Sequence, residues 1–285
     1  MLKSKKTFAG FLAVCCAVLL TLVFTILAAR GAMVKEPDLS YPFSNPIVYK
    51  ADDPWVIYDK RKGFDCYYYV WSGGNGIRLG KMDDFYKLDE VYNVPGRFLQ
   101  AWTASPGTPY SNEIWAPEIH FLSGKWYIYF TACSVLENHR MYILESKTSD
   151  PMDGFDFLGE LKTIPDRWAI DGTVMQYKGK LYFIWSGWEG LVNEAQHIYI
   201  AEMESPVKIS SERVKLSSPE LSWELTGFPL INEGPAAIEH NGLMHIMYSA
   251  NVSWVDEYCV GLLTLTGSDP LDANAWTKKD GPVLE

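Results

Sequence analysis

The sequence repeats one unit four times, roughly once every 60 residues, and this repeat constrains the fold more than any other feature. Each unit opens on an acid or on a Trp-Ala-Pro turn, passes through a glycine-containing turn and ends in an aromatic strand. A self-similar hairpin at a fixed period is typical of a radial all-β repeat such as a β-propeller. The units open at Asp53-Pro54-Trp55-Val56, Trp115-Ala116-Pro117-Glu118, Asp171-Gly172-Thr173-Val174 and Glu233-Gly234-Pro235-Ala236.

Strand signals continue after each repeated hairpin. Short runs rich in β-forming residues are separated by turns that contain glycine, which is the pattern of paired strands. No amphipathic helix is recognisable after residue 46. We therefore expect one all-β domain whose blades have four strands each, the outer one less regular. The third strands are predicted at residues 76–81, 141–146, 198–202 and 260–265.

The N-terminal segment has the pattern of a targeting sequence. Three lysines within the first six residues precede an uncharged stretch over residues 7–29, which is long enough to span a bilayer. Residues 1–33 are predicted to be a signal peptide or a signal-anchor, with residues 7–29 as the membrane tether in the second case. Either alternative places the domain over residues 34–285 outside the cytosol, secreted or membrane-anchored. The sequon Asn251-Val252-Ser253 would suit glycosylation there.

The net charge and the cysteine spacing argue against two kinds of ligand, nucleic acid and zinc. Beyond residue 30 the chain has 21 basic and 35 acidic side chains, a net charge of −14, so we expect no nucleic acid partner. Cys66, Cys133 and Cys259 have no CxxC or CxxH spacing, which argues against a zinc site. We expect these three to be small buried residues on strands.

Three of the four units open on a carboxylate. The innermost strands of a propeller surround its axis, so Asp53, Asp171 and Glu233, aligned to within one residue, should converge on one pocket, with Trp115 on its wall. Clustered carboxylates raise one another's pKa, so one stays protonated while another is ionised, as glycoside hydrolysis requires. The alternative is that each acid is a turn or cap residue. The spacing alone does not decide between them.

Several motifs occur in a fixed order along the chain. They are Asn45-Pro46-Ile47-Val48, Ala51-Asp52-Asp53-Pro54-Trp55-Val56, Ile114-Trp115-Ala116-Pro117-Glu118-Ile119-His120, Ala169-Ile170-Asp171-Gly172-Thr173 and Asn232-Glu233-Gly234-Pro235. Together they resemble glycoside hydrolase family 43, from about Asn45 to the C-terminus. The resemblance implies a five-bladed β-propeller that inverts configuration at the anomeric carbon. It also implies action on arabinofuranosyl or xylosyl linkages of plant cell-wall polysaccharides.

The resemblance also implies roles for the three acids. Asp53 matches the general base that activates water, Glu233 the general acid, and Asp171 the carboxylate that orients the acid and holds its pKa up. Asp52 adjoins the base, but the family pattern has its acid directly before the proline. Inversion leaves room for a water molecule, so the carboxyl groups of base and acid should lie roughly 6.5–9.5 Å apart.

Tryptophans at the ends of the inner strands are candidates for the walls of the substrate pocket. Trp71, Trp115 and Trp185 hold such positions. Glu118, in contrast, is expected to be structural and to bond within its own blade.

The chain departs from the family at its C-terminal end, where a fifth blade opening is absent. We therefore expect a five-bladed propeller that lacks its last blade in this chain, as in an incomplete copy of a longer protein. The family has a Gly-His-Asn segment there, whose histidine often lies beside a bound calcium ion or water. None of the five histidines has that context. His120 and His240 follow inner strands, and His139, His197 and His245 resemble surface or blade residues. No cofactor is expected to be required, and a calcium site would lack its expected ligand.

The expected function is that of an extracellular, monomeric exo-α-L-arabinofuranosidase acting on a polysaccharide or oligosaccharide. Two alternatives stay open. The same fold serves β-xylosidases, endo-arabinanases and related fructan-cleaving enzymes. The third hypothesis is a non-catalytic, membrane-tethered carbohydrate-binding propeller. The three intact acids argue against this hypothesis, and the absence of a fifth blade opening argues for it.

Overall fold

The computed structural model describes residues 52–284, so the predictions for the N-terminal targeting segment and for the linker after it lie outside the described residues. Within this range the chain is built of β-strands and five short 3₁₀ helices, η1 (Phe85–Tyr92), η2 (Leu136–Asn138), η3 (Pro151–Asp153), η4 (Ser222–Glu224) and η5 (Ala273–Ala275). None of the helices in residues 52–284 is long and apolar enough to cross a membrane.

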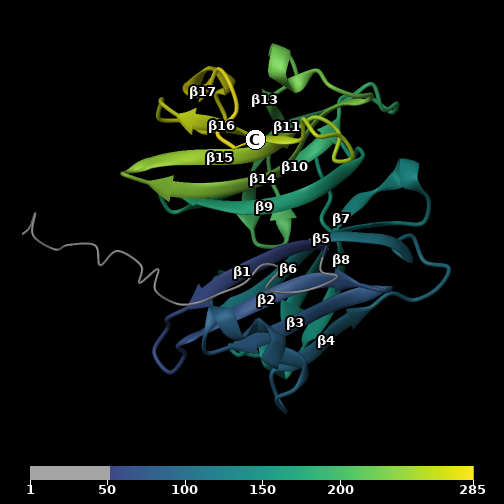
Figure 1. Cartoon of the computed structure of the whole chain (residues 1–285), viewed down its shortest axis with the longest axis vertical. Coiled ribbons are helices and arrows are strands. Elements are labelled where there is room, and N and C mark those ends of the chain that lie inside the picture. The colour runs from purple at the N-terminus through teal and green to yellow at the C-terminus, as the bar shows by residue number, and fades with distance from the viewer. Residues whose placement is uncertain (1–51, 285) are drawn as a thin grey trace, which may run out of the picture. The chain divides into compact units, whose positions relative to one another are not determined.

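The strands form four successive blades, each a meander of neighbouring antiparallel strands (Figure 1). Blade 1 comprises β1 (Asp52–Asp59), β2 (Cys66–Gly73), β3 (Gly76–Met82) and β4 (Phe98–Thr103). Blade 2 comprises β5 (Asn112–Leu122), β6 (Lys125–Cys133), β7 (Arg140–Ser146) and β8 (Phe155–Glu160). Blade 3 comprises β9 (Ala169–Tyr177), β10 (Lys180–Trp188) and β11 (Ala195–Ser205), with the short strands β12 (Lys208–Ile209) and β13 (Val214–Ser217) outside. Blade 4 comprises β14 (Leu230–His240), β15 (Leu243–Ala250), β16 (Cys259–Leu265) and β17 (Trp276–Lys278).

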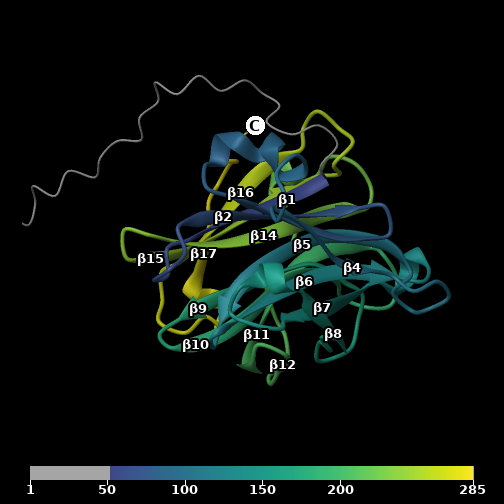
Figure 2. The same ribbon diagram turned by 90° about the horizontal axis from the view of Figure 1, so that it is seen from below.

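This arrangement confirms the predicted all-β propeller architecture and its four-stranded blades. The innermost strands are neighbours in space, β1 beside β5, β5 beside β9 and β9 beside β14 (Figure 2). Blades 3 and 4 are also joined by a short parallel pairing between β11 and β14. The described residues build four blades, and no fifth blade is formed by them.

The hydrophobic core lies between successive blades, where the facing sides of neighbouring sheets are buried against each other. One cluster joins blade 1 to blade 2, a second joins blade 2 to blade 3, and a third joins blade 3 to blade 4. Strands buried on both faces read as continuous apolar runs, which accounts for much of the aromatic content. Cys66, Cys133 and Cys259 are buried in these strands as free thiols, as predicted.

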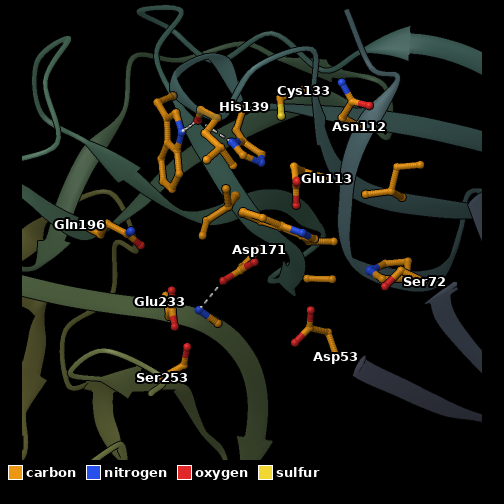
Figure 3. A pocket seen from close by; sticks show the side chains of 18 of the residues that line it. Asp53, Ser72, Asn112, Glu113, Cys133, His139, Asp171, Gln196, Glu233 and Ser253 are labelled. Atoms are coloured by element: carbon orange, nitrogen blue, oxygen red, sulfur yellow. Dashed lines mark hydrogen bonds between the residues drawn. The ribbon is translucent and has the colours of Figure 1, made fainter. Parts of the chain in front are cut away.

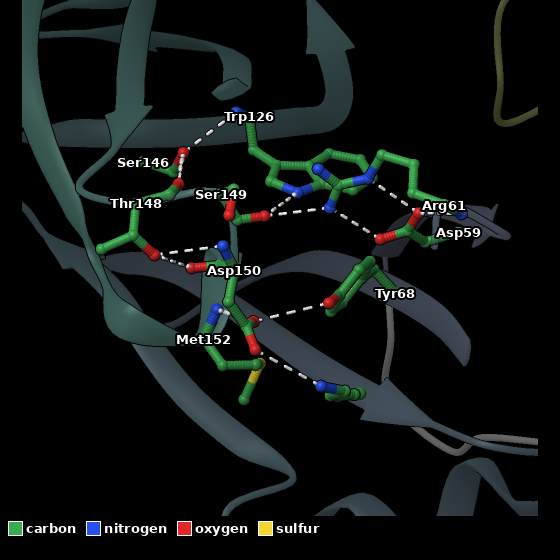
Figure 4. A network of polar contacts seen from close by, with 10 residues as sticks. Asp59, Arg61, Tyr68, Trp126, Ser146, Thr148, Ser149, Asp150 and Met152 are labelled. Carbon is green, nitrogen blue, oxygen red and sulfur yellow. Dashed lines mark hydrogen bonds and ion pairs between the residues drawn. The ribbon is translucent and has the colours of Figure 1, made fainter. Parts of the chain in front are cut away.

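A polar network also links blade 1 to blade 2, at the end of β1 farthest from Asp53 (Figure 4). Arg61 in the β1–β2 turn forms an ion pair with Asp59 at 2.8 Å and donates to the Ser149 carbonyl at 2.9 Å. Its guanidinium group also lies 3.7 Å from the centre of the Phe121 ring. A planar guanidinium group can make both kinds of contact at once, and here it holds two blades in register.

Candidate active site

Each innermost strand has a β-bulge at the same place, where two of its residues oppose one residue of the next strand. In β1, Asp53 and Pro54 together oppose Trp71, because Asp52 pairs with Ser72 and Trp55 with Val70. The equivalent bulges are Ala116-Pro117 in β5, Asp171-Gly172 in β9 and Gly234-Pro235 in β14. A bulge redirects the side chains around it and commonly lies beside a functional site.

The first residue of every bulge has a left-handed backbone. Its φ angle is 47° at Asp53, 43° at Ala116, 55° at Asp171 and 56° at Gly234. This region disfavours residues with a Cβ atom, although aspartate tolerates it better than most. Strain of this kind persists where the surrounding structure enforces it, and it is frequent at functional sites.

The bulges also fix how the three acids correspond. Asp53 and Asp171 hold the same position, the first residue of the bulge, whereas Glu233 precedes its bulge by one residue. The one-residue slack in the sequence alignment is therefore real, and the longer glutamate side chain starts from a different backbone position.

Asp53, Asp171 and Glu233 line a single cavity of about 1630 Å³. Figure 3 shows the three carboxyl groups directed into the same space from three different strands. The structure therefore brings together the three side chains that the repeat alignment grouped, which come from blades 1, 3 and 4.

Asp171 is held from both neighbouring blades. Its backbone N–H donates to the Thr131 hydroxyl of blade 2 at 3.1 Å, and its carboxylate accepts from the N–H of Gly234 in blade 4 at 3.0 Å (Figure 3). Since Gly234 directly follows Glu233, this second bond couples the position of Asp171 to the backbone that carries Glu233.

A buried network holds the strand that carries Glu233. Asn232 is fully buried; its carbonyl accepts from Ser186 of blade 3 at 2.8 Å, and its side-chain N–H donates to Glu224 at 3.1 Å. Glu224 forms an ion pair with Lys278 at 2.6 Å and accepts from Tyr248 at 2.8 Å. The backbone before Glu233 is therefore fixed by groups from two blades.

The electrostatics of the cavity favour the protonated forms of two of its acids, Asp171 and Glu233. Burial and the nearby charges of Glu233 and Asp53 hold the pKa of Asp171 well above its usual range. Burial, opposed by a hydrogen bond from Tyr258 and reinforced by Asp53, raises the pKa of Glu233 to about 7. Glu233 is therefore partly protonated at neutral pH, as a general acid must be.

Tyr258 is a site residue that sequence reasoning missed. Its hydroxyl group donates to Glu233 Oε1 at 3.2 Å, and it lines the same cavity. Burial and the charge of Glu233 raise the pKa of Tyr258, so its hydroxyl group keeps its proton at neutral pH. Tyr258 lies in the loop between β15 and β16, outside the repeated pattern, so no periodic signal marked it.

Glu118 bonds within its blade, as expected, and also to the next blade. It forms a 2.9 Å contact with His120 of the same strand. Burial raises its pKa, although hydrogen bonds with His120 and with Thr173 of β9 in blade 3 oppose this. Its charge also contributes to the raised pKa of Asp171, and Glu118 itself lines the cavity. Its role is therefore not confined to its own blade.

Of the three tryptophans predicted to line the pocket, Trp115 does so and the other two do not. Trp71 and Trp185 are 2% and 0% exposed, so their assignment to the pocket wall is wrong. The physical reason is the bulge: the residue opposite it is a buried aromatic in every blade, and Phe130 and Tyr248 hold the same position in blades 2 and 4.

Other aromatic residues form the wall instead. Trp168 and Trp188 line the cavity and stack with ring centres 4.6 Å apart, and His139 stacks on Trp115 at 4.3 Å. His139 is 1% exposed, so of the two expected alternatives it is not a surface residue; it directly precedes β7 of blade 2 and lines the cavity. Its Nδ1 atom bonds the Leu136 carbonyl at 2.7 Å, and burial lowers its pKa, so the ring is neutral at pH 7.

The described residues hold no group of three or more His, Cys, Asp or Glu side chains arranged to bind a metal ion. The expectation that no cofactor is required, and that a calcium site would lack its expected ligand, stays a prediction.

Comparison with known proteins gives consistent matches. The model of glycosyl hydrolases family 43 matches residues 43–285. An extracellular exo-α-(1→5)-L-arabinofuranosidase of Streptomyces avermitilis is 32% identical over 94% of this chain, and α-L-arabinofuranosidase 43 of Humicola insolens is 33% identical over 92%. The chain spans 55% and 54% of the length of these two relatives.

Among solved structures, the α-L-arabinofuranosidase from Lactobacillus brevis superposes with a TM-score of 0.76 at 32% identity, over 85% of this chain and 76% of that one. An endo-arabinase from Bacteroides thetaiotaomicron superposes with a TM-score of 0.67 at 17% identity, over 86% of this chain and 85% of that one. The latter likeness concerns the fold alone.

Proposed function

The chain belongs to glycosyl hydrolases family 43, and from this premise we propose that it is an extracellular, inverting exo-α-L-arabinofuranosidase. Its substrates would be arabinofuranosyl residues at the ends of polysaccharide or oligosaccharide chains. The observation that carries the proposal is the single cavity lined by Asp53, Asp171 and Glu233. The names of the relatives support the sugar, and the enzyme of Streptomyces avermitilis is called extracellular.

The proposed reaction is a single displacement. Asp53 removes a proton from a water molecule as the water oxygen bonds to the anomeric carbon, and the bond from that carbon to the leaving oxygen breaks. Glu233 gives its proton to the leaving oxygen, and the pKa of about 7 supports this role. Asp171 positions Glu233 through the hydrogen bond from Gly234. One face of the sugar receives water while the other releases the leaving group, so configuration inverts.

Hydrolysis of α-1,5-linked arabinobiose tests the proposal, because its leaving alkoxide, unlike a nitrophenolate, needs a proton from the general acid. Asp53→Asn and Glu233→Gln should each lower kcat by at least about 100-fold, because general acid or base catalysis contributes at least that factor. Glu239→Gln is the matched control: Glu239 is exposed on the same strand as Glu233 and does not line the cavity.

Three outcomes distinguish the hypotheses about function. Release of arabinose that both site variants lower by at least about 100-fold and the control retains supports the arabinofuranosidase. Activity on β-1,4-linked xylobiose alone would move the assignment to a xylosidase. Binding of arabino-oligosaccharide without any turnover would indicate a carbohydrate-binding propeller and contradict the proposal.

A further inference from the structure

The loop between β15 and β16, residues 251–258, forms part of the cavity rim. Ser253, Trp254 and Tyr258 all line the cavity that holds the three acids. Figure 3 shows Ser253 directly beside Glu233. The function derived so far gives a role to none of these residues except Tyr258.

The loop is fixed in place by the side chain of Asn251, which is fully buried. Its Nδ2 atom donates to the Glu257 carbonyl at 2.7 Å and to the Trp223 carbonyl at 2.9 Å, and its Oδ1 atom accepts from Thr226 N–H at 2.8 Å. The bond to Glu257 closes the loop on itself. These bonds also correct the glycosylation hypothesis, because the sequon nitrogen is buried and already engaged.

Trp254 projects from this fixed loop into solvent. All eleven tryptophans lie in the described residues, and Trp254 is the one whose side chain is mostly exposed, at 70%. A large aromatic ring at a cavity mouth offers an apolar face to a ligand in the cavity, and covering that face removes apolar surface from water. A ring presented by a rigid loop loses little further entropy when a ligand stacks on it.

The loop also identifies the side of the scissile bond that Trp254 faces. Tyr258 of the same loop donates to Glu233 Oε1, and in the proposed reaction Glu233 protonates the leaving oxygen. The loop therefore borders the leaving group and not the sugar that is cleaved. Trp254 offers an apolar face there, and Ser253 offers a hydroxyl group.

We propose that Trp254 forms a binding site for the sugar on the leaving-group side of the scissile bond, by stacking on its apolar C–H face. This inference rests on the proposed function, since Glu233 defines the side. Trp254 is thus a specificity-determining residue that favours an arabino-oligosaccharide over a substrate with one sugar.

Calorimetric titration of the intact Glu233→Gln protein tests the proposal. The probes are methyl α-L-arabinofuranoside, which is fixed in the five-membered ring and fills the place of the cleaved sugar alone, and α-1,5-linked arabinotriose, which also reaches the leaving-group side. Adding Trp254→Ala should weaken arabinotriose binding about tenfold, which corresponds to about 1.4 kcal/mol, and leave binding of the methyl glycoside unchanged. Trp254→Phe should retain most of the affinity, because it keeps an aromatic face.

Phe228→Ala is the matched control, because Phe228 is a 78% exposed aromatic residue that does not line the cavity. Unchanged arabinotriose affinity in Trp254→Ala, or an equal loss in Phe228→Ala, would overturn the inference. The inference would also be overturned if the Glu233→Gln protein with Trp254 intact bound arabinotriose no more tightly than methyl α-L-arabinofuranoside. If the wild-type protein cleaves arabinotriose but Trp254→Ala in the Glu233→Gln protein leaves the affinity for arabinotriose unchanged, only this sugar site is refuted and the proposed function stands. Wild-type protein that cleaves no arabinofuranoside would refute the proposed function itself.

Discussion

Removal of the Tyr258 hydroxyl group should move the alkaline limb of the pH–activity profile upward. The Tyr258→Phe variant loses the hydrogen bond to Glu233 Oε1, which has a length of 3.2 Å and favours the ionised carboxylate. A hydrogen bond to a charged group contributes about 1.5–3 kcal/mol. Tyr258 is 36% exposed, and water will replace part of the lost donor, so we expect about 1 kcal/mol. One pKa unit corresponds to about 1.4 kcal/mol, so the pKa of Glu233 should rise from about 7 by roughly 0.5–1 unit.

The sign follows from the role of Glu233. A general acid works only when protonated, so kcat/KM falls as pH rises through its pKa, and a higher pKa keeps the enzyme active at higher pH. The assay is kcat/KM for α-1,5-linked arabinobiose between pH 4 and pH 9, because departure of its leaving sugar depends on the general acid. Tyr92→Phe is the control, because Tyr92 is exposed in η1. An alkaline limb that stays in place or moves to lower pH in Tyr258→Phe would refute the reasoning.

Three further predictions concern stability and modification. Gly172→Ala should lower the melting temperature by roughly 5 °C, because its Cβ would lie 2.1 Å from Cζ of the buried Phe183 ring, and overpacking costs about 1–3 kcal/mol; calorimetry that finds no change would contradict it. Lys278→Met should cost about 3 kcal/mol in urea unfolding at pH 7, because it leaves the buried Glu224 carboxylate unpaired. Burial would raise the pKa of Glu224, but Lys278 and backbone N–H groups lower it overall. The stability lost in Lys278→Met should therefore be full above the ordinary glutamate pKa and shrink as pH falls below it. An equal loss of stability at pH 3 would argue against the ion pair. Asn251 should carry no glycan after expression in a glycosylating host, and a glycan mass on its peptide would contradict the buried position.

The fold could be predicted because its cause is local and repeated. Each hairpin carries its own alternation of turn and aromatic strand, and four copies in register specify a radial stack. The third strands lie within a few residues of the predicted ranges, since these runs are bounded by turn residues. The grouping of Asp53 with Asp171 was accessible for the same reason, because equivalent positions in a repeat meet at the axis.

The orientation of side chains around the bulges could not be predicted from the sequence. A bulge adds one residue to one strand, so it reverses which side chains face the cavity, and its place depends on pairing with the next strand. Trp71 and Trp185 were assigned to the wrong side for this reason. Loop residues were missed for another reason, since Tyr258 and Trp254 reach the cavity from a segment without periodicity. The place of that segment depends on tertiary contacts, among them the hydrogen bonds of Asn251 to Glu257 and Trp223 and that of Tyr258 to Glu233.

The stereochemistry of hydrolysis tests most directly the central claim, that Asp53 and Glu233 act on one sugar from opposite faces. Proton NMR of wild-type protein with an α-L-arabinofuranoside resolves the anomer that forms before mutarotation. Direct attack by a water molecule that Asp53 activates predicts β-L-arabinofuranose as the first product. Initial formation of the α anomer would mean a covalent intermediate on the protein, and would contradict the roles assigned to both carboxyl groups.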